Sequence, residues 1–159
     1  MAWFEDGGPI DYFRLQSEEH LVAMGWLEPD HDFVRGSVTP VDLASICGLL
    51  VDPWWPDFVF CGSHDCGFCA APDGPSHVTC SGVRVGIGWT NLFVPSIDEH
   101  CVYVAPSMIV HYIDAHGYQP SSGFLEAVRR CPPMGSEAHL AALVGIAGPG
   151  IQFRRRRAR

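Results

Sequence analysis

Three cysteines and one histidine lie within nine residues of this sequence, in the segment CGSHDCGFC at positions 61–69. The segment holds two pairs of metal-ligand type, Cys61-x-x-His64 and Cys66-x-x-Cys69. A Cys-x-x-Cys turn lets both sulfurs bind one tetrahedral zinc ion at about 2.3 Å, and backbone amides of the turn can donate to the thiolates. The two glycines of the segment suit a turn in which the backbone approaches closely. The spacing therefore predicts a structural zinc site.

Further ligands must come from outside this loop. Four ligands from nine consecutive residues would be crowded around one ion, so we expect two or three from the loop and the rest from afar. The candidates are His111, His116 and Cys131. Because His111 and His116 are five residues apart, they do not share a helical face as an i,i+4 pair would. Either one could instead be a hydrogen-bonded core or cap residue, and His116 lies in the last turn, where the helix dipole favours a cation.

Two enzymatic interpretations use the same loop. Cys66 and Cys69 could form a redox dithiol, but that role requires a helix N-terminus at the first cysteine, and the Pro/Gly-rich segment 70–77 predicts a loop instead. A zinc hydrolase or deaminase needs an open coordination position and a carboxylate base. Asp65 is adjacent, yet the sequence has no His-x-Glu or His-Glu-x-x-His pattern. Buried cysteines without a metal are the remaining alternative, and structural zinc is the preferred prediction.

The surrounding pattern predicts a single α+β domain over residues 1–150. Short apolar or alternating runs predict strands, of which the last three are joined by short links as an antiparallel meander. These strands are expected at 20–27, 58–60, 83–88, 92–94 and 102–104. The predicted zinc loop follows the second strand directly, and helices follow the meander.

Helix boundaries are predicted from capping residues. A capping box at 39–42, with proline at the first helical position, opens a helix that runs to about Leu50. Pro106 is expected to start a second helix that Gly117 stops in the left-handed conformation. Ser121 or Ser122 then caps a third helix. A fourth helix is expected between Ser136 and the Gly-Pro pair at 148–149.

Charge and composition restrict the class of protein. The chain has 159 residues and a formal net charge of −8, yet its last six residues, RRRRAR, hold five of the ten basic residues. An acidic body repels a phosphate backbone, so nucleic acid is expected at most at this tail, and residues 151–159 are interpreted as a disordered basic end. No apolar run approaches the ~20 residues that span a bilayer, and the N-terminus lacks a signal-peptide pattern. Seven partly clustered cysteines then indicate metal binding in a reducing cytoplasm, with no membrane contact.

Several short motifs occur in a characteristic order. They are GWL, GxHxCxxC, YxAP and HYIxxHxYxP, beginning at residues 25, 62, 103 and 111. This order, over about residues 10–135, resembles a family of small uncharacterised bacterial proteins that carry a domain of unknown function. The resemblance implies that the constant part of the loop is His-x-Cys-x-x-Cys, so that Cys61 lies outside it. The chain departs from the family pattern at Ser121-Ser122, where a second proline is expected. The resemblance implies no activity.

One zinc ion is therefore the predicted cofactor. The predicted ligands are His64, Cys66, Cys69 and His111, and the alternative fourth ligands are His116, Cys61 and Cys131. His111 is preferred because it leaves His116 free to cap its own helix. The predicted function is a zinc-stabilised binding or interaction module. Its acidic body suits a basic protein partner, as in inhibitor or immunity-type proteins. A zinc-dependent hydrolase or deaminase-like enzyme, or a thiol-redox protein, is the alternative.

Overall fold

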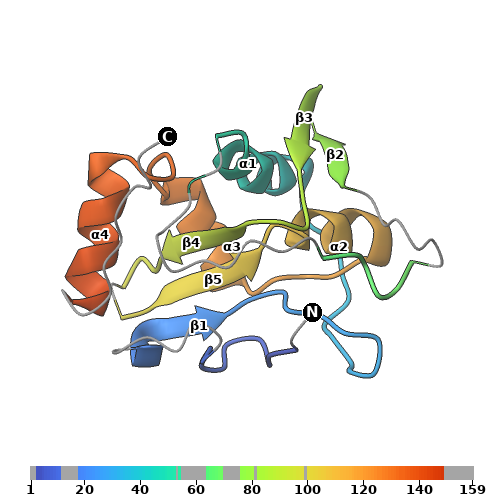
Figure 1. Cartoon of the computed structure of the whole chain (residues 1–159), viewed down its shortest axis with the longest axis horizontal. Helices are drawn as coiled ribbons and strands as arrows, with labels where there is room; N and C mark the ends of the chain where they lie inside the picture. Colours follow the sequence, from blue (N-terminus) through green and yellow to red (C-terminus); the bar gives the residue numbers. More distant parts are fainter. Residues whose placement is uncertain are drawn as a thin grey trace.

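The computed structural model describes residues 3–11, 18–52, 54, 64–69, 76–80, 82–98 and 100–148 (Figure 1). These ranges have an α+β architecture in which a mixed three-stranded sheet and a separate hairpin are packed with α-helices. The elements are the 3-10 helix η1 (Glu18–His20), β1 (Leu21–Ala23), α1 (Pro40–Leu50), β2 (His77–Cys80), β3 (Val83–Gly86), β4 (Asn91–Pro95), β5 (Val102–Pro106), α2 (Ile109–His116), α3 (Ser122–Arg130) and α4 (Glu137–Ala147).

The main sheet has the strand order β1-β5-β4. β4 and β5 are antiparallel, with Phe93 opposite Val104, whereas β1 runs parallel to β5, with Val22 opposite Tyr103. The outer edge of β1 is covered by the N-terminal segment, which forms an antiparallel bridge between Pro9 and Val22. The N-terminal segment therefore lies beside β1 and covers this edge of the sheet.

The predicted three-stranded meander is correct for the antiparallel pair β4 and β5 but wrong for its first strand. β3 does not pair with β4 but forms a hairpin with β2, which projects from the sheet in Figure 1. The cause lies at Gly88, whose φ of 83° turns the chain sharply between the two strands. His77, which the sequence pattern predicts to be in a loop, is the first residue of β2. The strand expected at 58–60 lies outside the described residues.

Most helix boundaries follow the predicted caps. Thr39 caps α1, because its Oγ1 accepts from the Asp42 amide at 3.1 Å. Ser121 and Ser136 cap α3 and α4 in the same manner. Gly117 ends α2 with a φ of 66°. Helix α2 begins later than expected, however, because Pro106 is the last residue of β5 and the helix starts three residues after it.

The core lies between the main sheet and the helices. Its largest fully buried side chains include Trp26, Phe93 and Phe124. The indole Nε1 of Trp26 donates to the carbonyl of Val104 at 2.8 Å, so this buried polar atom is satisfied. Within the described ranges, no helix is long and apolar enough to cross a membrane.

Candidate metal centre

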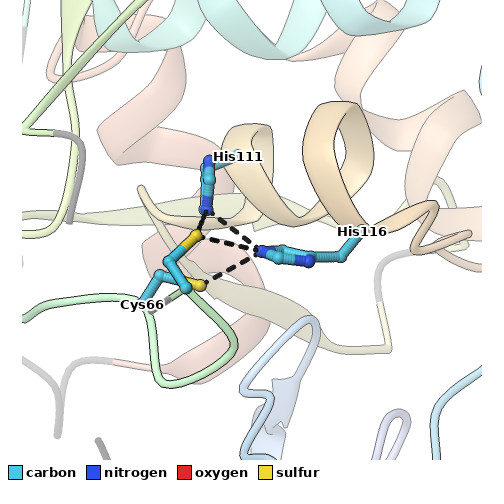
Figure 2. A group of neighbouring side chains, drawn as sticks. Cys66, His111 and His116 are labelled. Carbon is cyan, nitrogen blue, oxygen red and sulfur yellow. Dashed lines mark hydrogen bonds between the residues drawn. The ribbon is translucent and has the colours of Figure 1, made fainter. Parts of the chain in front are cut away.

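Four side chains of metal-ligand type converge between the cysteine loop and α2. Cys66 and Cys69 come from the loop, and His111 and His116 come from the helix (Figure 2). One ligand atom from each residue lies within 4.8 Å of every other. Cys66 is buried, with 3% of its surface exposed, and His111 is 7% exposed. The structure therefore forms a two-cysteine, two-histidine group that is able to hold a metal ion.

Four of the six distances within this group are close to the edges of a coordination tetrahedron. Zinc bonds of about 2.3 Å to sulfur and about 2.0–2.1 Å to nitrogen place sulfur and nitrogen ligands about 3.5 Å apart and two nitrogens about 3.4 Å apart. His116 Nε2 lies 3.2 Å from Cys66 Sγ and 3.6 Å from Cys69 Sγ. His111 Nε2 lies 3.3 Å from Cys69 Sγ and 3.2 Å from His116 Nε2. All four distances fall within a few tenths of an ångström of the tetrahedral values.

The loop geometry prepares the first cysteine as a ligand. The Cys69 amide donates to the Cys66 carbonyl at 3.3 Å, which closes the turn between the two cysteines. Burial raises the pKa of the Cys66 thiol, while backbone N–H groups of Phe68 and Cys69 that donate to its sulfur oppose this rise. Such donors stabilise a thiolate and orient it, which is the role expected of the outer shell of a metal site.

The two histidines meet although they are five residues apart. Their positions are about 140° apart around the helix, since an α-helix has 3.6 residues per turn. His116 is the last residue of α2, and its ring points back toward His111 in Figure 2. The ring centroids lie 4.9 Å apart at an interplanar angle of 86°. The end of the helix thus gives the second histidine the freedom to share one site with the first.

Both imidazoles are held in the form that binds metals. Burial lowers the pKa of His111, and the neighbouring His116 lowers it further. Burial also lowers the pKa of His116, with an additional contribution from the positive charge of Arg35. At neutral pH both rings are therefore neutral, as metal ligation requires.

A buried serine connects the cysteine loop to the start of α2. Ser107, two residues before the helix, accepts from the amides of Gly88 and Thr90 at 3.0 and 3.3 Å through its Oγ. The Gly88 carbonyl in turn accepts from the His64 amide at 2.7 Å. A side chain at residue 88 would place its Cβ 2.5 Å from the His64 carbonyl oxygen, so this close approach requires glycine. These bonds hold the loop beside the helix.

The segment after β1 holds the other end of α2. Arg35 donates to the His116 carbonyl at 2.7 Å, and the Gly36 amide donates to the Gly117 carbonyl at 3.0 Å. The same segment contacts the cysteine loop through Phe33, whose ring centroid lies 5.5 Å from that of Phe68. The segment is therefore held by both halves of the candidate metal centre.

A family model described as Domain of unknown function (DUF7919) matches residues 2–129. The chain belongs to this family. The matched range includes all five strands, α1, α2 and the four cluster residues, whereas α4 lies beyond it. No curated protein and no solved structure matches the chain. The resemblance to a domain of unknown function is confirmed, while a bacterial origin and the family motifs stay predictions.

This DUF7919 chain brings most of the predicted ligands together. Cys66, Cys69 and His111 lie in the group, and the fourth place belongs to the alternative, His116. The side chain of His64 is not in the group, and its backbone amide donates to the Gly88 carbonyl instead.

The alternative ligand Cys131 is not in the group. Cys131 directly follows the last residue of α3, and its thiol donates to the Pro132 carbonyl at 3.4 Å. Cys61 lies outside the described residues. The signal for His116 was its place in the same motif as His111, whereas the preference for His111 assumed that His116 caps its own helix.

Proposed function

We propose that this group binds one zinc ion, that the zinc is structural, and that the chain acts as a zinc-stabilised interaction module. The observation that carries the proposal is the group of two sulfur and two nitrogen atoms, in which four of the six separations are close to tetrahedral edges. Tetrahedral sites with two sulfur and two nitrogen ligands are typical of zinc. Cys66, Cys69, His111 and His116 are the proposed ligands.

The complete ligand set argues against a catalytic zinc. Catalytic sites bind the ion through three protein ligands and leave the fourth position to water or substrate, whereas structural sites use four protein ligands. Here two sulfurs and two nitrogens lie within 4.8 Å of one another, so an ion bound by all four would have its tetrahedral positions filled. A protein of this kind uses its zinc for folding and presents its surface for binding.

The thiol chemistry also argues against a redox pair. A reactive dithiol needs a lowered pKa at its attacking cysteine. In this loop burial raises the pKa of Cys66. Two imidazole nitrogens also lie within 3.6 Å of Cys69 Sγ, an arrangement that ligation explains and disulfide exchange does not need.

A zinc ion at this position would contribute much of the stability of the fold. It would join a loop to a helix that follows it by more than 40 residues in sequence. Structural zinc contributes roughly 10–16 kcal/mol of apparent free energy in small zinc domains, and the whole stability of a domain is about 5–15 kcal/mol. Zinc removal is therefore expected to unfold at least the loop and the end of α2.

The test is metal analysis together with cobalt substitution. Protein purified without chelator should contain close to one zinc per chain. The cobalt-substituted protein should show the strong visible absorption of a tetrahedral thiolate site, and added azide should leave this spectrum unchanged because no coordination position is open. A spectrum that shifts with azide would overturn the structural role, and folded protein without bound metal would overturn the site itself.

A further inference from the structure

A groove on the surface combines carboxylates with aromatic rings. It has a volume of about 380 Å³ and lies between the N-terminal segment and the segment after β1, which run near each other below the sheet (Figure 1). Its lining consists of Trp3, Phe4, Glu5, Asp6, Leu27, Asp32, Phe33 and Val34. We propose that this groove docks an arginine-containing segment of a partner protein, an inference that rests on the proposed role as an interaction module.

The lining has the chemistry that recognises a guanidinium group. Three of its residues are acidic, three are aromatic and none is basic. Arginine pairs with carboxylates through two parallel hydrogen bonds and also stacks on aromatic faces, which lysine does less well. One face of the Phe33 ring is already covered in this way by the chain's own Arg35, whose guanidinium carbon lies 4.2 Å from the ring centroid. The combination of charge and ring faces therefore favours arginine.

Of the three acidic residues in the lining, one forms hydrogen bonds within the fold and the other two are proposed to bind the partner. Asp6 is committed to the fold, because its Oδ1 accepts from the Gly25 amide at 2.7 Å and its Oδ2 accepts from the Tyr118 hydroxyl at 2.6 Å. Glu5 and Asp32 are both exposed, one on each segment. These two carboxylates are the proposed partners of the incoming guanidinium group.

A second hollow extends the groove. It has a volume of about 630 Å³ and shares Asp6 and Val34 with the first, so a bound segment can continue from one hollow into the other. Its lining is mainly apolar, with a few polar side chains such as Tyr103 and Gln119, and its one acidic residue is Asp6. The shape therefore fits an extended peptide better than a single side chain.

The candidate metal centre supports one wall of the groove. Phe33 packs edge-on against Phe68 of the cysteine loop, at 5.5 Å, and against Tyr118 beyond α2, at 6.1 Å. Arg35, two residues further on, is bonded to the carbonyl of His116. The docking wall is thus fixed in place by the elements that a zinc ion would join, which provides the physical link between the proposed metal and the proposed binding surface.

The test uses a fluorescent heptapeptide of alternating glycine and arginine, with the zinc-loaded full chain, and measures binding by anisotropy. The double variant Glu5→Gln/Asp32→Asn should bind the peptide about tenfold or more weakly than the unchanged chain. The control Glu19→Gln/Glu126→Gln also removes two negative charges, but from exposed positions outside the groove. It should change the affinity for the peptide by less than about twofold. A citrulline version of the peptide should not bind.

Three results would overturn the assignment. Equal losses in the two double variants would mean attraction by net charge alone, and no binding of the arginine peptide would mean no such site. Binding that emerges only when the five tail arginines are replaced by serine would make the chain's own tail the occupant. Zinc content is measured on the same samples. If the peptide does not bind but each chain contains one zinc ion, the docking proposal is refuted and the structural zinc is not. If the chain contains no zinc, the proposed function is refuted, whether or not the peptide binds.

Discussion

Alanine substitutions at three histidines should separate the metal ligands from a neighbour. His111→Ala and His116→Ala each remove an imidazole nitrogen of the tetrahedral group. If four ligands share the roughly 10–16 kcal/mol of structural zinc equally, one ligand accounts for about 2.5–4 kcal/mol, or on the order of a 10²–10³-fold loss in zinc affinity. His64→Ala keeps the backbone bond to Gly88 and removes no atom of the group. It should bind zinc with nearly unchanged affinity.

The assay is competition for zinc against a chromophoric chelator at neutral pH, with the melting temperature of each variant recorded by circular dichroism. The His64 variant is the matched control, because its ring is half-buried like that of His116 and burial lowers its pKa as it lowers those of His111 and His116. Loss of zinc in the His64 variant with retention in the His116 variant would refute the ligand assignment. Retention of zinc in all three variants would refute the participation of α2.

Three further substitutions test the structure around the site. Tyr118→Phe removes the hydroxyl that donates to the Asp6 carboxylate at 2.6 Å and should lower the free energy of unfolding by about 1.5–3 kcal/mol, measured with urea; an unchanged value would contradict the bond. Gly88→Ala should lower both the melting temperature and zinc affinity, because φ is positive and the new Cβ would lie 2.5 Å from the His64 carbonyl oxygen; a raised melting temperature would contradict this. Burial lowers the pKa of His139, so the folded chain binds fewer protons than the unfolded chain, and stability should fall as the pH drops below about 6.5. His139→Gln should reduce this pH slope in urea unfolding, and an equal slope would exclude the contribution.

Local structure was the part of the fold that the sequence could predict. The caps at Thr39, Ser121 and Ser136 and the left-handed stop at Gly117 each depend on the chemistry of a few neighbouring residues. Strand pairing depends on residues far apart in the chain. The parallel partner of β5 lies about 80 residues earlier in the sequence. No local pattern predicts that the chain turns at Gly88, so that β3 does not pair with β4.

In the candidate site, too, the local features could be predicted from the sequence and the long-range ones could not. The spacing of Cys66 and Cys69 predicts a shared ion because the chelating turn is itself local. The choice among the histidines is not local. His64 is nearer to the cysteines in sequence, yet its backbone is tied to another turn, whereas His116 reaches the group because the helix ends there. Helical periodicity predicts the direction in which a side chain leaves the helix. At the last residue of a helix, however, the side chain can turn back toward a neighbour on another face.

The two proposals have a thermodynamic consequence when they are taken together. The segment from Phe33 to Gly36 contacts the cysteine loop on one side and the end of α2 on the other, and it also forms a wall of the groove. A zinc ion that orders these elements would raise the affinity of the groove for its partner. Because coupling between two binding events is reciprocal, a partner bound in the groove would raise the affinity for zinc by the same factor. A purely structural metal would in this way still act on binding, through the conformation of one short segment and without any contact with the partner.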